Sequence, residues 1–459
     1  MEHKNVWEKY DAKQIEEVNA LSDAYRIFLD KGKTERECID QIVNRIEKDG
    51  YIELEELIKE NKTLKAGDKV YSVCMNKSIV MYHIGKRSMV EGLNILGAHI
   101  DSPRLDVKQN PLYEDGGIAY LDTHYYGGVK KYQWVTLPLA LHGVIVKKDG
   151  TTIEVNVGED EDDPVFFVSD LLIHLAGEQL EKKAAKVIEG EALDIVVGNM
   201  PIINKDKEKE EKEAVKKNVL QILKDMYDIE EEDFLSAEIE VVPAGRAREA
   251  GFDRSMVLAY GHDDRVCAYP AEQAIFSIEN PDYTAITVLT DKEETGSDGN
   301  TGLQSSYLVY FINDLAKANG LEGFQVLSKS ECLSADVNSA YDPTFNSVFE
   351  KNNTSYLNKG VVITKYTGAR GKSGTSDASA EYMGKIRNML DKAGVIWQIG
   401  ELGKVDAGGG GTVAKYIANL DVDVVDLGVP VLSMHAPYEV ISKLDLYMAY
   451  RAFTEFFKQ

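Results

Sequence analysis

Two adjacent glutamates, Glu293 and Glu294, lie between an apolar run and a glycine turn. The apolar run at residues 285–289 has the length and the flanking turn residues of a buried strand. Because neighbouring residues of a strand point in opposite directions, two glutamates at its end can do different work. One carboxylate can hold a cation while the other faces a water molecule. Most such pairs are solvated surface residues, so this pair alone is weak evidence.

Four further stretches place a candidate ligand after an apolar run. His99, Asp263 and His435 follow such runs directly, whereas Asp336 comes several residues after the run at 324–327. In open α/β sheets, ligands bind outside the carboxyl ends of the strands. Taken singly, each residue has an ordinary alternative as a satisfied polar residue, a surface ion pair or a helix cap. The five stretches together favour one site.

This set supplies two imidazoles and four carboxylates, from His99, His435, Asp263, Glu293, Glu294 and Asp336. Mixed nitrogen and oxygen ligands suit zinc, manganese or cobalt. A pair of metals needs a bridging carboxylate, and a spare carboxylate can then act as general base. Asp101, two residues after His99, can accept the other imidazole N–H and fix the tautomer.

The elements that must position these residues alternate between strands and helices. Residues up to about 60 are expected to be helical, with apolar positions at 21, 25, 28 and 29. Later helices are predicted at 301–319, at 376–393 with Ser376 or Asp377 as the cap, and at 442–458. We therefore predict an α/β fold in which helices cover both faces of a mixed sheet.

A change in the residue pattern in the middle of the chain predicts an inserted domain. Residues 108–250 contain strand-like pieces at 139–146 and 152–157, and a lysine- and glutamate-rich run at 204–217. We interpret 108–250 as a mostly-β insert and the run as a solvated loop or helix face. The catalytic domain is then discontinuous, at 1–107 and 251–459.

Composition limits the function classes. Of 459 residues, 44% are hydrophobic and 28% charged, with a formal net charge of −25. Such acidity argues against nucleic acid or an anionic membrane as partner. We expect a cytoplasmic protein, because the N-terminus lacks a signal-peptide pattern, no apolar run could cross a bilayer and four scattered cysteines fit reduced thiols.

The motifs at residues 97–103, 263–265, 291–297, 334–336 and 433–435 together resemble a family of metalloaminopeptidases. This family includes aspartyl aminopeptidase and vacuolar aminopeptidase I, and the resemblance covers nearly the whole chain. It implies a zinc-peptidase-like fold and a hydrolase that removes N-terminal residues from peptides with a free N-terminus.

The resemblance also implies a role for each residue. His99 and Asp336 would hold one metal, Glu294 and His435 the other, and Asp263 would bridge both. The two metals would polarise the scissile carbonyl and dock the free α-amino group. Glu293 would take a proton from the attacking water and pass it to the leaving amine, and Asp101 would orient His99.

For assembly, the resemblance implies that the insert is a dimerisation domain and that dimers build a tetrahedral homododecamer. A histidine of this domain would reach a neighbouring subunit's site and stabilise the tetrahedral intermediate. His174 is similar to that residue, although it could equally be a histidine packed on a helix face at an interface.

The residues that follow Asp336 bear on substrate specificity. Aspartyl aminopeptidases usually continue with histidines after the Ser-Ala-Asp motif, and residues 337–343 contain none. This favours the aminopeptidase I branch and neutral or apolar N-terminal residues. The alternatives are specificity for N-terminal Asp or Glu, a two-metal deacylase of N-acyl amino acids and a non-catalytic scaffold, the last opposed by the complete ligand set and Glu293.

Two further features have open interpretations. The run Gly408 to Gly411 could bring backbone amides near a substrate or form a flexible surface loop. Lys365 and Tyr366 lie where the family has substrate-contacting residues, but they fit a strand with a solvent-directed lysine slightly better.

Overall fold

The computed structural model describes residues 5–60, 62, 64–203 and 212–459. The chain forms two compact units. The first contains Met1–Ser102, Ala247–Met434 and Glu439–Gln459, and the second contains Pro103–Arg246 and His435–Tyr438. The second unit thus consists of one long insert and a short later segment that begins at His435.

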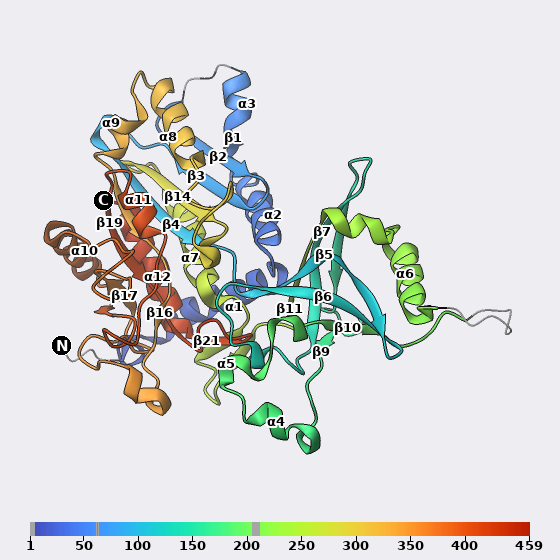
Figure 1. Cartoon of the computed structure of the whole chain (residues 1–459). Coiled ribbons are helices and arrows are strands. Elements are labelled where there is room, and N and C mark those ends of the chain that lie inside the picture. Colours follow the sequence, from blue (N-terminus) through green and yellow to red (C-terminus); the bar gives the residue numbers. More distant parts are fainter. Residues whose placement is uncertain (1–4, 61, 63, 204–211) are drawn as a thin grey trace. The chain divides into compact units, whose positions relative to one another are not determined.

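The first unit is built on a nine-stranded mixed sheet (Figure 1). In order across the sheet its strands are β1 (Ile52–Glu53), β2 (Lys69–Cys74), β3 (Ser78–His83), β14 (Thr284–Thr290), β4 (Leu93–His99), β15 (Glu331–Ser334), β19 (Asp423–Gly428), β17 (Val361–Thr364) and β18 (Trp397–Ile399). The four central neighbours from β14 to β19 run parallel. Their carboxyl ends therefore lie along one edge of the sheet, and the predicted mixed α/β fold is confirmed.

Alternate residues of the central strands enter two different cores, as expected for a sheet covered on both faces. Leu96 and Ala98 of β4 belong to one core, whereas Ile95 belongs to the other. The helices of the first core are α1 (Ala12–Lys31), α2 (Glu35–Ile46), α7 (His262–Ser277), α10 (Ala380–Ala393) and α12 (Lys443–Phe457). Those of the second are α3 (Leu54–Lys59), α8 (Tyr307–Ala318), α9 (Gly323–Leu327) and α11 (Ala414–Ala418).

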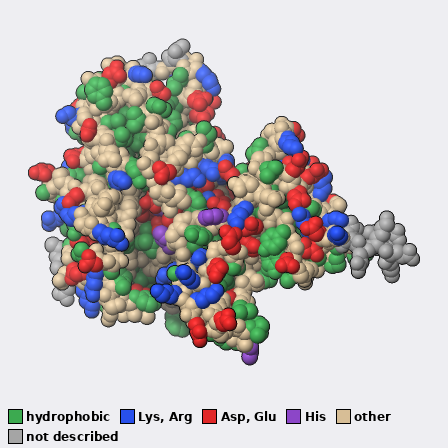
Figure 2. Space-filling view, in the orientation of Figure 1, with side chains coloured by type: hydrophobic (Ala, Val, Ile, Leu, Met, Phe, Trp, Pro, Cys, Tyr) green, Lys and Arg blue, Asp and Glu red, His purple; other side chains and the backbone are tan. Residues whose placement is uncertain are grey.

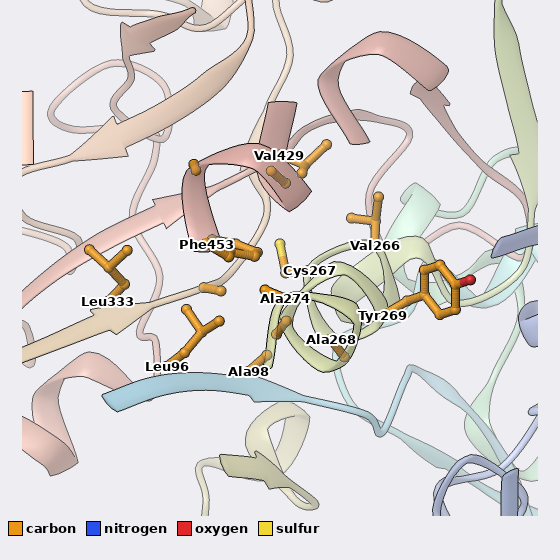
Figure 3. Close-up of a cluster of buried hydrophobic side chains, with 14 of the residues drawn as sticks. Leu96, Ala98, Val266, Cys267, Ala268, Tyr269, Ala274, Leu333, Val429 and Phe453 are labelled. Carbon is orange, nitrogen blue, oxygen red and sulfur yellow. The ribbon is translucent and has the colours of Figure 1, made fainter. Parts of the chain in front are cut away.

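Helix α7 packs closely on β4 because its sheet-facing side chains are small. Figure 3 shows Leu96 and Ala98 below this helix, with Cys267 and Ala274 among its buried residues. Phe453 of α12 belongs to the same cluster and lies beside Cys267 in Figure 3. This packing fixes the start of α7, which carries Asp263 and Asp264.

A second, five-stranded sheet of the first unit presents other segments of the site. Its strands are β12 (Arg248–Ala250), β13 (Met256–Ala259), β21 (Glu439–Ser442), β20 (Pro430–Leu432) and β16 (Asn338–Ser339). Strand β13 leads into Asp263, and β16 follows Asp336. The apolar runs predicted around 257 and 430 are therefore strands of this smaller sheet, not of the central one.

Three predicted elements need correction. Helix α8 begins at Tyr307 and not at 301, because the Thr301 hydroxyl donates to Asp291 and holds the preceding turn out of the helix. Helix α10 is capped by Ser379, not by Ser376 or Asp377, since Asp377 is paired with Lys365. The run at 324–327 is the helix α9 and not a strand, because Glu322 and Gln325 form a capping box there.

The second unit contains a seven-stranded antiparallel sheet. Its strands in order are β8 (Thr152–Val157), β7 (Leu139–Val146), β11 (Ala237–Pro243), β5 (Arg104–Asp115), β6 (Ile118–Tyr126), β10 (Ile195–Gly198) and β9 (Phe167–Val168). Helix α6 (Ala214–Tyr227) and the sheet line a mostly apolar pocket of about 630 Å³ that is open to solvent. Of the predicted lysine- and glutamate-rich run, residues 204–211 lie outside the described residues, and α6 begins at Ala214.

Figure 2 shows acidic and basic side chains intermixed over the visible surface. Among the helices that the structure describes, none is long and apolar enough to span a bilayer. The four cysteines are free thiols, which agrees with the sequence prediction.

Candidate metal centre and active site

The turn that carries Glu293 and Glu294 follows β14 and is fixed by backbone hydrogen bonds. Lys292 adopts a left-handed conformation with φ 69° and precedes the short 3-10 helix η7 (Glu293–Thr295). The buried carboxylate of Asp101 accepts the backbone N–H of Glu293 through Oδ1 and that of Glu294 through Oδ2, both at 3.2 Å. Both glutamates are therefore presented from a rigid turn.

His99 ends β4, directly opposite Thr290 at the end of β14. Its Nδ1 lies 3.1 Å from the Asp101 carbonyl oxygen and 3.2 Å from Asp101 Oδ1. Its Nε2 lies 3.3 Å from Asp263 Oδ1, 3.8 Å from Glu293 Oε2 and 3.9 Å from Asp336 Oδ1. The ring is thus held at one nitrogen and presents the other to three carboxylates.

Asp263 and Asp264 lie at the start of α7, where the backbone departs from helical geometry and the peptide bond between them is cis. The Asp263 N–H donates to Glu439 Oε2 at 2.9 Å, and the Ser102 hydroxyl donates to the Asp263 carbonyl at 2.7 Å. Asp264 Oδ2 accepts the backbone N–H of His99 at 3.3 Å. The two aspartates are therefore locked against the strand that ends in His99.

Asp336 lies two residues beyond β15. The N–H of Ala335 donates to the Gly97 carbonyl at 2.6 Å, which continues the pairing of β15 with β4 and brings Asp336 toward His99.

Two groups of candidate ligand atoms result, and within each group all the atoms lie within 4.8 Å of one another. One group comes from His99, Asp264 and Asp336, and the other from His99, Asp263 and Glu294. Sequence reasoning did not select Asp264. The sequence signal for Asp264 was its position directly after Asp263, but nothing in the sequence shows which of two adjacent carboxylates points into a site.

Buried negative charge dominates the electrostatics. Burial raises the pKa of Asp264 well above its usual range, and the nearby Asp263 raises it further. Burial also raises the pKa of Asp336, with added repulsion from Asp264 and Glu293. For His99, burial lowers the pKa, but the carboxylates of Asp101 and Asp263 outweigh it and raise the pKa well above the ordinary value. A bound cation would relieve this repulsion.

Two other predicted site residues lie in the second unit. His435 has its Nδ1 2.9 Å from the Gly128 carbonyl oxygen and is not in either group of ligand atoms described above. His174 lies in the 3-10 helix η4 (Ile173–Leu175) and is exposed. Its neighbours Ile173 and Leu175 are each 68% exposed.

The remaining sequence features have structural partners. A Cβ on Gly408 would lie 1.5 Å from the Leu402 carbonyl oxygen, and one on Gly409 would lie 2.4 Å from the Gly368 carbonyl oxygen. These two glycines of the run are therefore required for close backbone packing. Lys365 follows β17 and forms an ion pair with Asp377, and the Tyr366 hydroxyl donates to Glu401 Oε1 at 2.6 Å. The side chains of Lys365 and Tyr366 therefore both have partners within the fold.

Comparison with known proteins identifies the class. Residues 28–457 match the family described as aminopeptidase I zinc metalloprotease (M18). A relative from Clostridium acetobutylicum, named probable M18 family aminopeptidase 1, is 54% identical over 459 residues, with 99% of this chain and 98% of the relative covered.

Solved structures agree. The crystal structure of aminopeptidase I from C. acetobutylicum has a TM-score of 0.94 at 53% identity and covers 100% of both chains. An M18 aminopeptidase from Thermotoga maritima also has a TM-score of 0.94, at 44% identity, over 100% of this chain and 99% of that one. The chain belongs to the M18 family of zinc aminopeptidases, and it is a metalloaminopeptidase.

The residues around His99 fit zinc. Zinc binds nitrogen and oxygen ligands at about 2.0–2.2 Å in a tetrahedral arrangement, which separates neighbouring ligand atoms by about 3.3–3.6 Å. His99 Nε2 and Asp263 Oδ1 are 3.3 Å apart, and both are buried. An imidazole nitrogen facing several carboxylates is a donor set that zinc commonly uses.

Proposed function

We propose that this metalloaminopeptidase uses two divalent ions, most readily zinc, and Glu293 as general base. His99 and Asp336 would hold one ion, Glu294 and His435 the other, and Asp263 would bridge them. The observation that carries the proposal is the convergence of Asp263, Glu293 and Asp336 on His99 Nε2 within 3.9 Å. Asp264, beside Asp336, is a further carboxylate available to the first ion.

When bound, the ions would supply Lewis acidity that polarises the scissile carbonyl and lowers the pKa of water. The remaining chemistry belongs to Glu293. Its carboxylate would accept a proton from the attacking water and return it to the nitrogen of the leaving amine. Asp101 would orient both a metal ligand and the base, because its carboxylate contacts His99 Nδ1 and accepts the N–H of Glu293.

We further propose that the enzyme prefers neutral or apolar N-terminal residues. Asn338, the polar side chain nearest in sequence after Asp336, donates to Thr364 Oγ1 at 3.1 Å and accepts from the Ser355 hydroxyl at 3.0 Å. Both ends of its amide are therefore occupied within the fold. No histidine follows Asp336 in residues 337–343 to attract an acidic side chain.

For assembly, we propose that the second unit mediates dimers that build a homododecamer in the cytoplasm. A structure of the yeast protein mApe1, with a TM-score of 0.77 at 19% identity, is described as a dodecamer. The exposed apolar residues around His174 support an interface there, because large exposed apolar patches commonly mark contacts. His174 would then reach a neighbouring subunit's site.

The experiment that tests this function is hydrolysis of aminoacyl-p-nitroanilides carrying Asp, Glu, Leu, Met, Lys or Ala. Each substrate is assayed with chelator and with added zinc, manganese or cobalt. We expect chelator-sensitive cleavage that favours Leu or Met over Asp, and no cleavage of N-acetylated substrates. A preference for Asp or Glu would contradict the specificity, and cleavage of N-acyl amino acids alone would indicate a deacylase.

A further inference from the structure

The short helix α11 contacts the segments that carry several of the site residues. A Cβ placed on Gly97, two residues before His99, would lie 3.2 Å from Ile417 Cδ1 of this helix. Val413 and Ile417 are both fully buried beside β4, and α11 also packs against β15 and β19. Gly97 therefore allows α11 to lie directly on the strand that ends in His99.

From α11, Tyr416 reaches the turn that carries the glutamates. Its hydroxyl donates to the Gly296 carbonyl at 2.9 Å, and the Gln304 side-chain amide donates to the same oxygen at 2.7 Å. The Gly296 N–H in turn donates to the Glu293 carbonyl at 2.9 Å. The end of the turn is thus fixed by Tyr416 and Gln304, just as its beginning is fixed by Asp101.

The other end of α11 is anchored to the strand that leads to Asp336. Thr412 lies beside the buried carboxyl of Asp426, whose Oδ1 accepts the Ser334 hydroxyl at 2.7 Å. Burial raises the pKa of Asp426 to about 6, while the hydroxyls of Ser334 and Thr412 favour its ionised form. A chain of contacts therefore connects Ser334, through Asp426, Thr412 and α11, to Gly296.

We propose that Tyr416 is a positioning residue, whose hydrogen bond to Gly296 holds Glu293 at a fixed place relative to His99 and Asp336. This inference rests on the proposed function, in which Glu293 is the general base. The phenol is close enough to Glu293 for the carboxylate charge to add to burial in raising the pKa of Tyr416. Small displacements of a proton-transfer group cost rate steeply, so the hydrogen bond affects turnover more than substrate binding.

The test is Tyr416→Phe, which removes the hydroxyl and keeps the ring. With the metal-loaded protein and Leu-p-nitroanilide, we expect kcat to fall about three- to tenfold, the range of one lost hydrogen bond, while KM changes less than about twofold. Metal content is expected to equal that of the wild type. Hydrogen–deuterium exchange at the backbone amides of residues 293–296 is expected to accelerate.

Controls separate this role from a general loss of stability. Tyr310→Phe, on the exposed face of α8, is expected to leave kcat and exchange unchanged. The Gln304 side-chain amide donates to the same Gly296 carbonyl as the Tyr416 hydroxyl. In the double variant, the effects of Gln304→Ala and Tyr416→Phe on kcat are therefore expected to be non-additive.

Unchanged kcat and unchanged exchange in an active Tyr416→Phe enzyme would overturn the positioning role, as would a rise in KM that accounts for the whole loss. If the wild type cleaves no p-nitroanilide with any metal, the proposed function fails. The exchange measurement then still decides whether Tyr416 holds the turn.

Discussion

Oδ1 of Asp101 lies 3.2 Å from the backbone nitrogen of Glu293, and the same oxygen lies 3.2 Å from Nδ1 of His99. One buried carboxylate therefore orients both a candidate ligand and the candidate base. Any change at Asp101 should disturb both functions together, which distinguishes it from a residue that acts on one of them.

Asp101→Asn tests this coupling. The amide would retain one acceptor oxygen but would direct an NH₂ group toward a backbone N–H, so the turn would lose a hydrogen bond and His99 would lose the negative charge beside its Nδ1. We expect kcat/KM and zinc affinity each to fall about 10- to 100-fold, the usual scale for a group that orients a metal ligand. Steady-state kinetics and competition with a zinc indicator measure the two effects. Asp162→Asn, an exposed carboxylate in the other unit, is the matched control.

Glu293→Gln separates the base from the ligands. We expect kcat to fall by at least about a hundredfold, because the amide cannot accept the proton. Metal content should remain, since Glu293 is not among the two groups of candidate ligand atoms. Glu294→Gln is the contrasting variant and should lose metal as well as activity. If Glu293→Gln kept wild-type turnover, the assigned base would be wrong.

Removal of metal should also destabilise the protein. Without a cation, the carboxylates of Asp263, Asp264 and Asp336 repel one another in a buried site. A ligand that binds only the folded state raises the unfolding midpoint, so chelation is expected to lower it and added zinc to restore it. Differential scanning fluorimetry measures the shift, and an unchanged midpoint together with full activity in excess chelator would contradict the metal centre.

Asp445 gives a prediction of pH dependence away from the site. Burial raises the pKa of Asp445 to about 7, although the N–H groups of Asn358 and Gly360 donate to its two oxygens. Because this pKa lies above the value of about 3.9 in the unfolded chain, its contribution to stability is present at low pH and is lost as pH rises toward and through 7.

The midpoint of the wild type minus that of Asp445→Asn should therefore decrease from about pH 5 to about pH 7 and level off above that pH. Thermal unfolding at each pH measures this difference. Asp421→Asn, at an exposed carboxyl, is the matched control. A difference that grows with pH would mean that burial does not raise the pKa of Asp445.

The strands that end at the site could be predicted because burial on both faces leaves continuous apolar runs. Strands β4 and β14 occupy the predicted stretches, and α12 lies within the helix predicted at 442–458. The run at 324–327 misled because four apolar or neutral residues suit a short helix as well as a strand, and the capping box of Glu322 decides between them.

Contacts between distant residues could not be predicted from local patterns. Tyr416 and Gly296 are separated by 120 positions, and no local motif links the two. The inward turn of Asp264 depends on the pairing of its carboxylate with the His99 N–H, which is a tertiary contact. Residue types and spacing thus predict candidate ligands, whereas the interactions that hold them in place need the structure.

The measurement that tests the two-metal centre most directly is anomalous X-ray scattering at the zinc edge from crystals of the zinc-loaded protein. We predict two peaks, one contacted by His99 and Asp336 and the other by Glu294 and His435, with Asp263 between them. A single peak, or peaks away from the carboxylates around His99 Nε2, would contradict the proposed centre.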